Sequence, residues 1–265
     1  MKALTSLCVG IAVIGTAVSD FAASVTVTTL IGTGNPGYSE NAVNNPYGME
    51  IGPDGFGGDG GPGTKAQLRQ PHSLLFDRDS TLLICDIGNH RIRRLHVDTG
   101  VIETYTGTGE AAATPEGAPV RGTPLKGPRT LAMARNGDLY LALREGNAIY
   151  RIDAKTQTLH RVAGTGQAGY SGDGGPALNA TLGGPKGLAY DGSENLYLAD
   201  TENHAIRRIS LKTGIISTVL GTGERGDGPE ANPLACKLSR PHGVLFAKGV
   251  LFVSDSEAHR LRELR

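Results

Sequence analysis

Short apolar runs separated by glycine, proline and polar residues fill most of the chain, and this pattern is typical of closely spaced β-strands. The stretch 187–220 shows the pattern most fully, because four β-rich runs in it end at turn residues. Runs such as 196–199 are continuously apolar, so we expect both faces of those strands to be covered. The pattern therefore predicts small sheets that stack on one another.

One unit of this kind recurs along the chain. It starts at four prolines spaced 57, 57 and 56 residues apart, namely Pro71, Pro128, Pro185 and Pro241. A fixed period of this length indicates a repeat architecture, and twisted four-stranded sheets stacked radially are the blades of a β-propeller. We therefore predict an all-β propeller of four-stranded blades, with blades at about 71–109, 128–166, 185–223 and 241–265.

The two ends of the chain predict how the ring closes. The last unit stops at Arg265 after three β-rich runs, and the segment 25–34 resembles the missing fourth run of a blade. We expect this N-terminal strand to pair into the last blade and complete it, which removes an unpaired edge. The segment 46–57 looks like one strand of a further, partial blade. The interval from Pro46 to Pro71 is 25 residues in place of 57, and natural shortening and internal truncation both explain it.

Two motifs carry a resemblance to a known family. The third-strand motif Asp-x-x-Asn-His with following Ile and Arg stands at 86–93 and 200–207, and the linker Gly-Tyr-Ser-Gly-Asp-Gly-Gly-Pro stands at 169–176. Through these residues the chain after residue 24 resembles NHL-repeat proteins, in particular exported bacterial ones. The resemblance implies a propeller that commonly has six blades. The second unit departs from the motif, with Leu143 and Asn147 where Asp and His are expected.

The N-terminus predicts export. Lys2, an apolar run over 3–18 and small residues after it have the pattern of a signal peptide, here 1–23, so the domain 24–265 is expected to be secreted or periplasmic. The run is short for a membrane span and no later one is long enough, so we expect no span after cleavage; an uncleaved anchor is the alternative. Cys85 and Cys236 lack metal-ligand spacing, and we expect thiols rather than a disulfide.

Charge adds one exclusion. The 26 basic and 26 acidic residues balance, so no global field attracts nucleic acid, and we expect none as a partner. The arginines of the third strands, such as Arg93 and Arg207, are placed regularly enough to predict salt bridges between blades rather than an RNA-binding patch. The recurrent Gly-Thr-Gly sequences are expected to be turns, because no helix with Lys and Ser or Thr follows them.

Candidate chemistry gathers at one end of the predicted propeller. In an antiparallel blade the turn between the second and third strands lies at the same end as the connection to the next blade. The candidate ligand residues at that end are His72, Asp86, Asn89, His90, Asp173, Asp200, Asn203, His204, Asp227 and His242. Such donors suit Ca²⁺ or Zn²⁺. Residues that recur in every blade also satisfy turn backbone groups, and we favour that structural interpretation for the motif residues.

The sequence contains no recognisable Ser-His-Asp elbow, His-Glu-x-x-His motif or Cys-His nucleophile site. We therefore expect an exported binding scaffold for a protein, peptide or carbohydrate, and not an enzyme. The alternative is a metal-dependent propeller enzyme, lactonase-like or amidating-lyase-like, with its site at the channel mouth. Non-repeating polar residues where inner strands begin would mark such a site, and the candidates are His72, His242, Glu50 and Arg129. The sequence predicts neither the ligand nor the oligomeric state.

Overall fold

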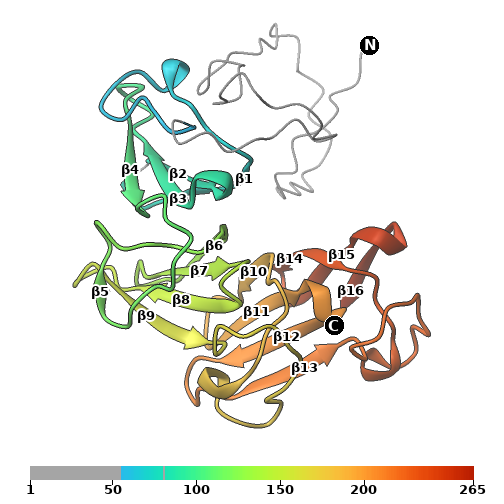
Figure 1. Ribbon diagram of the computed structural model, residues 1–265. Helices are drawn as coiled ribbons and strands as arrows, with labels where there is room; N and C mark the ends of the chain where they lie inside the picture. The colour runs from blue at the N-terminus through green and yellow to red at the C-terminus, as the bar shows by residue number, and fades with distance from the viewer. Residues whose placement is uncertain (1–54, 80) are drawn as a thin grey trace, which may run out of the picture.

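The structure is a computed structural model that describes residues 55–79 and 81–265 of the chain (Figure 1). In these residues the regular elements are β-strands and single turns of 3-10 helix, so the fold is all-β as predicted. The proposed signal peptide 1–23, the strand 25–34 and nearly all of the partial blade 46–57 lie outside the described residues. Within that part of the chain, no helix has the length and apolar character that crossing a membrane requires.

The strands form four antiparallel sheets that are the blades of a β-propeller, each built from consecutive strands. Blade one contains β1 (Pro71–Phe76), β2 (Leu82–Asp86), β3 (Arg91–Leu95) and β4 (Ile102–Thr106). Blade two contains β6 (Pro128–Met133), β7 (Leu139–Leu143), β8 (Ala148–Ile152) and β9 (Thr158–Ala163). Blade three contains β10 (Gly187–Tyr190), β11 (Asn195–Asp200), β12 (Ala205–Ser210) and β13 (Ile216–Leu220). Blade four contains β14 (Pro241–Ala247), β15 (Val250–Asp255) and β16 (Arg260–Leu264).

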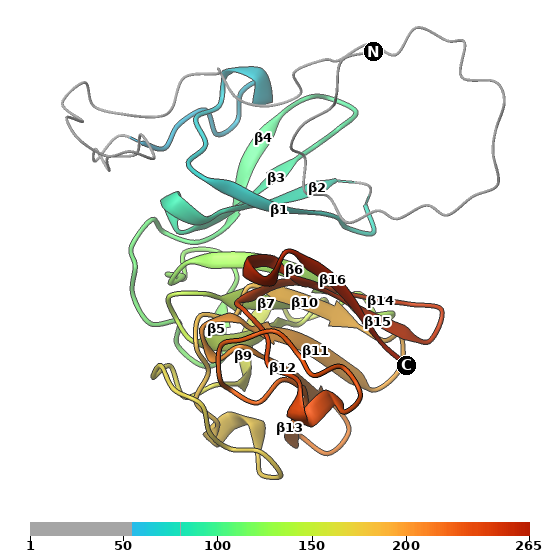
Figure 2. The same cartoon turned by 90° about the vertical axis from the view of Figure 1, so that its right-hand side faces the viewer.

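The blades follow one another around an axis so that their first strands are innermost (Figures 1 and 2). Strand β1 contacts β6, β6 contacts β10, and β10 contacts β14. At the first of these junctions the Ser73 and Thr130 hydroxyl oxygens lie 3.2 Å apart. The inner strands therefore begin close together, and residues at equivalent positions in them can face a common space.

The predicted burial of the second strands is confirmed for β2, β7 and most of β11, where Tyr197 is half-buried, whereas buried and half-buried residues alternate along β15. Every residue of β2 and of β7 is buried, since each of these strands lies inside its sheet with a neighbouring blade on at least one face. Apolar clusters fill the spaces between successive blades; Leu83 of β2 and Leu131 of β6 share the first, and Ala199 of β11 and Val253 of β15 share another. Cys85 and Cys236 are buried free thiols, as expected.

Blade two carries one element that the sequence pattern did not predict. The two-residue strand β5 (Ala118–Pro119) precedes the blade in the chain and pairs with the outermost strand β9, so this sheet has the order β5-β9-β8-β7-β6. Two residues are too few to produce an alternating apolar pattern, and Pro119 cannot donate a ladder hydrogen bond. The added strand covers the outer edge of blade two.

Six 3-10 turns complete the regular structure of the described residues. Three of them, η2 (Ile87–Asn89), η4 (Thr201–Asn203) and η6 (Ser256–Ala258), connect the second and third strands of blades one, three and four. The others, η1 (Gly63–Lys65), η3 (Ala177–Asn179) and η5 (Pro233–Ala235), lie in the Gly-rich linkers before blades one, three and four.

Candidate site at the channel mouth

The end of the propeller where the inner strands begin, called the mouth below, brings three kinds of segment together. In blade one Pro71 is opposite Asp86, so the start of β1 lies beside the turn from β2 to β3. The outer strand β4 ends there too, because Thr106 is opposite Ile92. Inner-strand starts, motif turns and blade connections therefore share one end of the molecule.

The motif aspartate holds the turn of blade one together. The Asp86 side chain is fully buried and accepts hydrogen bonds from the Arg69 backbone N–H at 2.6 Å and from Asn89 Nδ2 at 2.8 Å. Arg93 Nη1 lies 3.5 Å from the same carboxylate. Burial raises the pKa of Asp86, while the hydrogen bonds and the arginine oppose that rise. A carboxylate with these partners is committed to the fold.

Blades three and four repeat the arrangement. Asp200 accepts from the Gly183 N–H at 2.6 Å and from Asn203 Nδ2 at 2.8 Å, and Arg207 Nη1 lies 3.2 Å away. Burial raises the pKa of Asp200 to about 6, against the opposing effect of the same hydrogen bonds and of Arg207. In blade four, which carries no Asn in its turn, Asp255 accepts from the Ser239 N–H and pairs with Arg262 at 2.9 Å.

The aspartates of the Gly-Asp-Gly loops bind the same arginines from the other side. Asp59 lies 2.6 Å from Arg93, Asp173 lies 2.8 Å from Arg207, and Asp227 pairs with Arg262. The arginine of each third strand thus connects the aspartate of its own turn to a linker aspartate. The guanidinium groups of Arg93 and Arg207 are fully buried, which makes them structural ion pairs, as predicted for the third-strand arginines.

The motif histidines link neighbouring blades. His90 and His204 adopt left-handed backbone conformations, with φ of 49° and 51°. Each Nδ1 atom accepts a hydrogen bond from the backbone N–H of the residue that precedes the first proline of the next blade. His90 accepts from Gly127 at 3.2 Å, and His204 accepts from Arg240 at 3.1 Å. Asn147 performs the same task in blade two through Oδ1, with φ of 46°. Asn replaces His there because both residues tolerate this conformation and both offer an acceptor.

A metal ion does not fit these motif residues. Their carboxylates already bind arginine and backbone donors, and their imidazoles accept inter-blade hydrogen bonds. Within residues 55–79 and 81–265, no three His, Cys, Asp or Glu side chains converge as metal ligands. The candidate Ca²⁺ or Zn²⁺ site predicted for the mouth therefore has no donor set among the motif residues that the structure describes.

A different set of side chains occupies the mouth without repeating from blade to blade. It consists of the residue that directly follows the first proline in each unit, and its members are His72, Arg129, Lys186 and His242. We call these four residues the mouth ring. Sequence reasoning identified three of them but missed Lys186, although its position after Pro185 is the same signal. Glu50, the other sequence candidate, lies outside the described residues.

The mouth ring is strongly basic. Lys186 Nζ lies 2.9 Å from His242 Nε2, and burial together with the charge of Lys186 lowers the pKa of His242 to about 4. Much of His72 is open to solvent, yet partial burial and the charge of Arg129 lower its pKa to about 4 as well. Both imidazoles are thus neutral near pH 7, because burial and the neighbouring cations both disfavour the protonated ring.

The two residues of the ring that are charged at neutral pH, Lys186 and Arg129, are poorly compensated. Lys186 is only 7% exposed and has Glu202 at 3.7 Å, but Glu202 is already held by Arg240 at 2.6 and 2.9 Å. Burial and the charge of Arg240 lower the pKa of Lys186 to about 8. Arg129 is half-buried, and within the described part of the chain it forms no hydrogen bond or ion pair.

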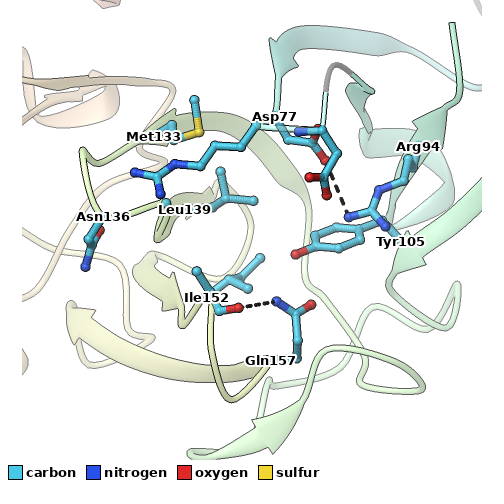
Figure 3. A pocket seen from close by; sticks show the side chains of 12 residues that line it. Asp77, Arg94, Tyr105, Met133, Asn136, Leu139, Ile152 and Gln157 are labelled. Atoms are coloured by element: carbon cyan, nitrogen blue, oxygen red, sulfur yellow. Dashed lines mark hydrogen bonds and ion pairs between the residues drawn. The ribbon is translucent and has the colours of Figure 1, made fainter.

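A cleft lies at the end opposite the mouth, between blades one and two (Figure 3). This cleft of about 200 Å³ has Met133, Leu139 and Ile152 in its lining, together with polar residues of the strand-connecting turns. Its Arg94 is neutralised by Asp77 at 3.5 Å and stacks on the Tyr105 ring at 4.3 Å. The cleft thus contains a cation that is already paired, whereas Arg129 at the mouth has no such partner among the described residues.

Comparison with known proteins identifies the repeat. A family model described as the Teneurin NHL domain matches residues 157–241. NHL repeat-containing protein 2 of Gallus gallus is 26% identical over 231 residues, which cover 75% of this chain and 31% of that protein. The chain belongs to the NHL-repeat family. This NHL-repeat protein is also 32% identical to the protein SUPPRESSOR OF QUENCHING 1 of Arabidopsis thaliana over 140 residues, 53% of the chain and 13% of the relative.

The NHL-repeat chain thus spans about a third or less of the length of these two relatives. Among solved structures it is similar to an auxiliary nutrient binding protein from Bacteroides thetaiotaomicron, with a TM-score of 0.58 and 18% identity. The match covers 76% of this chain and 48% of the other. At that level of identity the likeness establishes the propeller fold alone.

Proposed function

We propose that this NHL-repeat protein is an exported binding scaffold, secreted or periplasmic, that presents the mouth to a protein, peptide or carbohydrate ligand. The observation that carries the proposal is the contrast between two sets of residues at one end of the molecule. The motif residues repeat in the blades and are engaged in structural contacts, whereas the mouth ring varies in residue type, with His, Arg, Lys and His in the four blades, and keeps uncompensated donors. A ligand site is where such a departure from the repeat is expected.

Two further observations support the proposal. A propeller of similar fold is an auxiliary nutrient binding protein. The mouth also groups side chains from different blades, as concave binding surfaces of repeat proteins do.

The metal-dependent enzyme alternative is disfavoured by electrostatics. A cation placed beside His72 and His242 would be repelled by Arg129 and Lys186, and its binding would have to overcome that repulsion at short range. Elemental analysis of the dialysed protein for calcium and zinc tests this point. One tightly held ion per chain would favour the enzyme alternative, and we expect less than a stoichiometric amount.

The binding function is tested by screening the purified protein against glycan and peptide arrays that include neutral and acidic members. The variant His72→Ala changes an exposed mouth residue, and Arg135→Ala changes an exposed arginine in the turn after β6, at the opposite end of blade two. We expect the wild type and Arg135→Ala to retain the same ligands and His72→Ala to lose or weaken them. Binding that is insensitive to mouth variants, or no binding at all, would contradict the proposal.

A further inference from the structure

We propose that the mouth ring binds the oxyanion group of a small acidic ligand, a carboxylate or a phosphate, between Arg129 and Lys186. This inference rests on the proposed binding function and names the chemical class of its ligand. It predicts that a negative charge on the ligand, and not only its shape, determines recognition.

Arg129 and Lys186 lie at the starts of two neighbouring inner strands. Arg129 is the second residue of β6, Lys186 immediately precedes β10, and these two inner strands contact each other. The charge of Arg129 lowers the pKa of Lys186, and so does that of Arg144 from the turn after β7. Like charges held this close repel one another unless a negative group lies between them. Blades two and three thus direct cations into one space.

The Arg129 guanidinium needs hydrogen-bond acceptors that the described residues do not supply. Arg129 is half-buried with no hydrogen bond or ion pair among the described residues, and burial lowers its pKa. Taking a guanidinium out of water is costly unless hydrogen-bond acceptors replace the water. A bound carboxylate or phosphate would supply two acceptors in the plane of the guanidinium, which is the arrangement arginine prefers.

Two glutamates near the mouth ring are bound to arginines outside it. Glu145 is 3.0 Å from Arg144, and Glu202 binds Arg240 through both oxygens. Both glutamates therefore pair with a cation outside the mouth ring, although the Glu145 carboxylate also acts electrostatically on Arg129. The mouth ring is left with excess positive charge that the described residues do not cancel, and an anionic ligand would neutralise it.

The two neutral imidazoles of the mouth ring supply hydrogen-bond donors as well. Protonated Lys186 donates to His242 Nε2, which places the proton of the neutral ring on Nδ1. That N–H is then a hydrogen-bond donor for a ligand oxygen, as is one ring nitrogen of neutral His72. The ring therefore offers donors of two kinds, charged ones for an oxyanion and neutral ones for hydroxyl or carbonyl oxygens attached to it.

Isothermal titration at low ionic strength with three probes tests the inference: D-glucuronate, inorganic phosphate and D-glucose. Glucuronate and glucose differ at one carbon, which carries a carboxylate in the first and a hydroxymethyl group in the second. We expect glucuronate or phosphate to bind and glucose not to bind, with affinity that decreases as salt is added. Binding of glucuronate alone would identify the anion as a carboxylate, and binding of phosphate alone would identify it as a phosphate.

Variants locate the binding. We expect Arg129→Ala to weaken the binding of the anion at least tenfold and Arg129→Lys to recover only part of it, because lysine cannot form the paired contact. Arg135→Ala removes an arginine from the opposite end of the same blade and should leave the affinity unchanged. Thermal unfolding of each variant confirms that it is folded.

Two results would overturn the inference. Anion affinity equal in the wild type and Arg129→Ala would place the anion elsewhere. Failure of both anions to bind, while neutral array ligands bind in a mouth-dependent manner, would refute the acidic ligand and leave the proposed scaffold function standing.

Discussion

Lys186 is buried and its charge is only weakly compensated by Glu202, so it should decrease the stability of the protein near neutral pH. Its pKa of about 8 in the fold lies below the ordinary value of 10.5, so the folded state binds fewer protons than the unfolded state between those pH values. The free energy of unfolding contributed by this group therefore rises as pH increases from 8 to 10.5, and the full penalty is present below pH 8.

We predict that Lys186→Met raises the free energy of unfolding at pH 7 by about 1–3 kcal/mol, since methionine fills similar space without a buried charge. Urea denaturation measures the change. The same variant should lose affinity for glucuronate. A variant that is both less stable and equally able to bind the anion would contradict the role we give this lysine.

The pH dependence of ligand binding gives an independent prediction. Lys186 is faced by Arg129, Arg144, Arg240, Glu202 and His242, and it loses its proton as pH rises through about 8. The carboxylate of glucuronate does not titrate in this range, so its binding should weaken between pH 7 and pH 10. Lys186→Arg keeps the charge to higher pH and should flatten the dependence. An equally steep decrease in that variant would assign the titration to another group.

Asp200 has the opposite role, because it compensates a buried arginine. Asp200→Ala would leave Arg207 with only the exposed Asp173 as an ionic partner and would leave the Gly183 N–H without its acceptor. We expect a loss of about 3–5 kcal/mol in the free energy of unfolding. Asp98→Ala, at an exposed turn, is the control and should change it by less than about 0.5 kcal/mol. Equal effects in urea denaturation would refute the structural role.

At the scale of elements, the Gly-Thr-Gly turn after each outer strand is set by close backbone approach. A Cβ on Gly164 would lie 2.3 Å from the Asn147 carbonyl oxygen, and its φ is +85°. Gly174 has a similar φ of +77° but open space around it. This pair separates the cost of the backbone conformation from the cost of the contact.

We therefore predict that Gly174→Ala lowers the free energy of unfolding by about 1–2 kcal/mol and that Gly164→Ala lowers it clearly more, because its Cβ also forces the end of β9 away from the Asn147 carbonyl oxygen. Thermal unfolding of both variants checks the prediction. Similar Tm values for the two would show that the contact with Asn147 is easily relieved.

The elements could be predicted well from sequence where residues repeat. Four blades could be placed from the prolines at which the units begin and from the continuously apolar second strands. Glycine and polar turn residues indicated most of the connections between strands. Strand β5 was missed because two residues carry no periodic signal. The link from His90 to Gly127 was also missed, since a side chain that bonds across 37 residues leaves no local pattern.

For the whole molecule, closure of the ring depends on what pairs with the free edge of strand β16. Among described strands β16 pairs only with β15, and Leu261 on it is 75% exposed. An unpaired strand with an exposed apolar side chain is a template for pairing. The prediction that segment 25–34 pairs with it can be tested by hydrogen exchange.

We expect Leu30→Asp to speed amide exchange in β16, because a charge in the pairing segment would weaken its docking, and Ser39→Asp outside that segment to leave exchange unchanged. Equal exchange in both variants and the wild type would refute closure by this strand.

The mouth ring shows where sequence reasoning stops at the molecular scale. The motif candidates such as Asp86 were found because they repeat, and repetition is also why they are structural. His72, Arg129 and His242 were visible as departures from the repeat. Their basic character as a group was not visible, since it depends on Lys186 and on which carboxylates are already paired in space.

The most direct test of an acid-binding mouth is to observe the Arg129 side chain by NMR during a titration with D-glucuronate, with its Nε–H signal assigned through its absence in Arg129→Lys. The account predicts a saturable shift of this signal with glucuronate and none with D-glucose. Shifts confined to arginines of the opposite end, such as Arg135, or no arginine shift at saturating ligand, would contradict it.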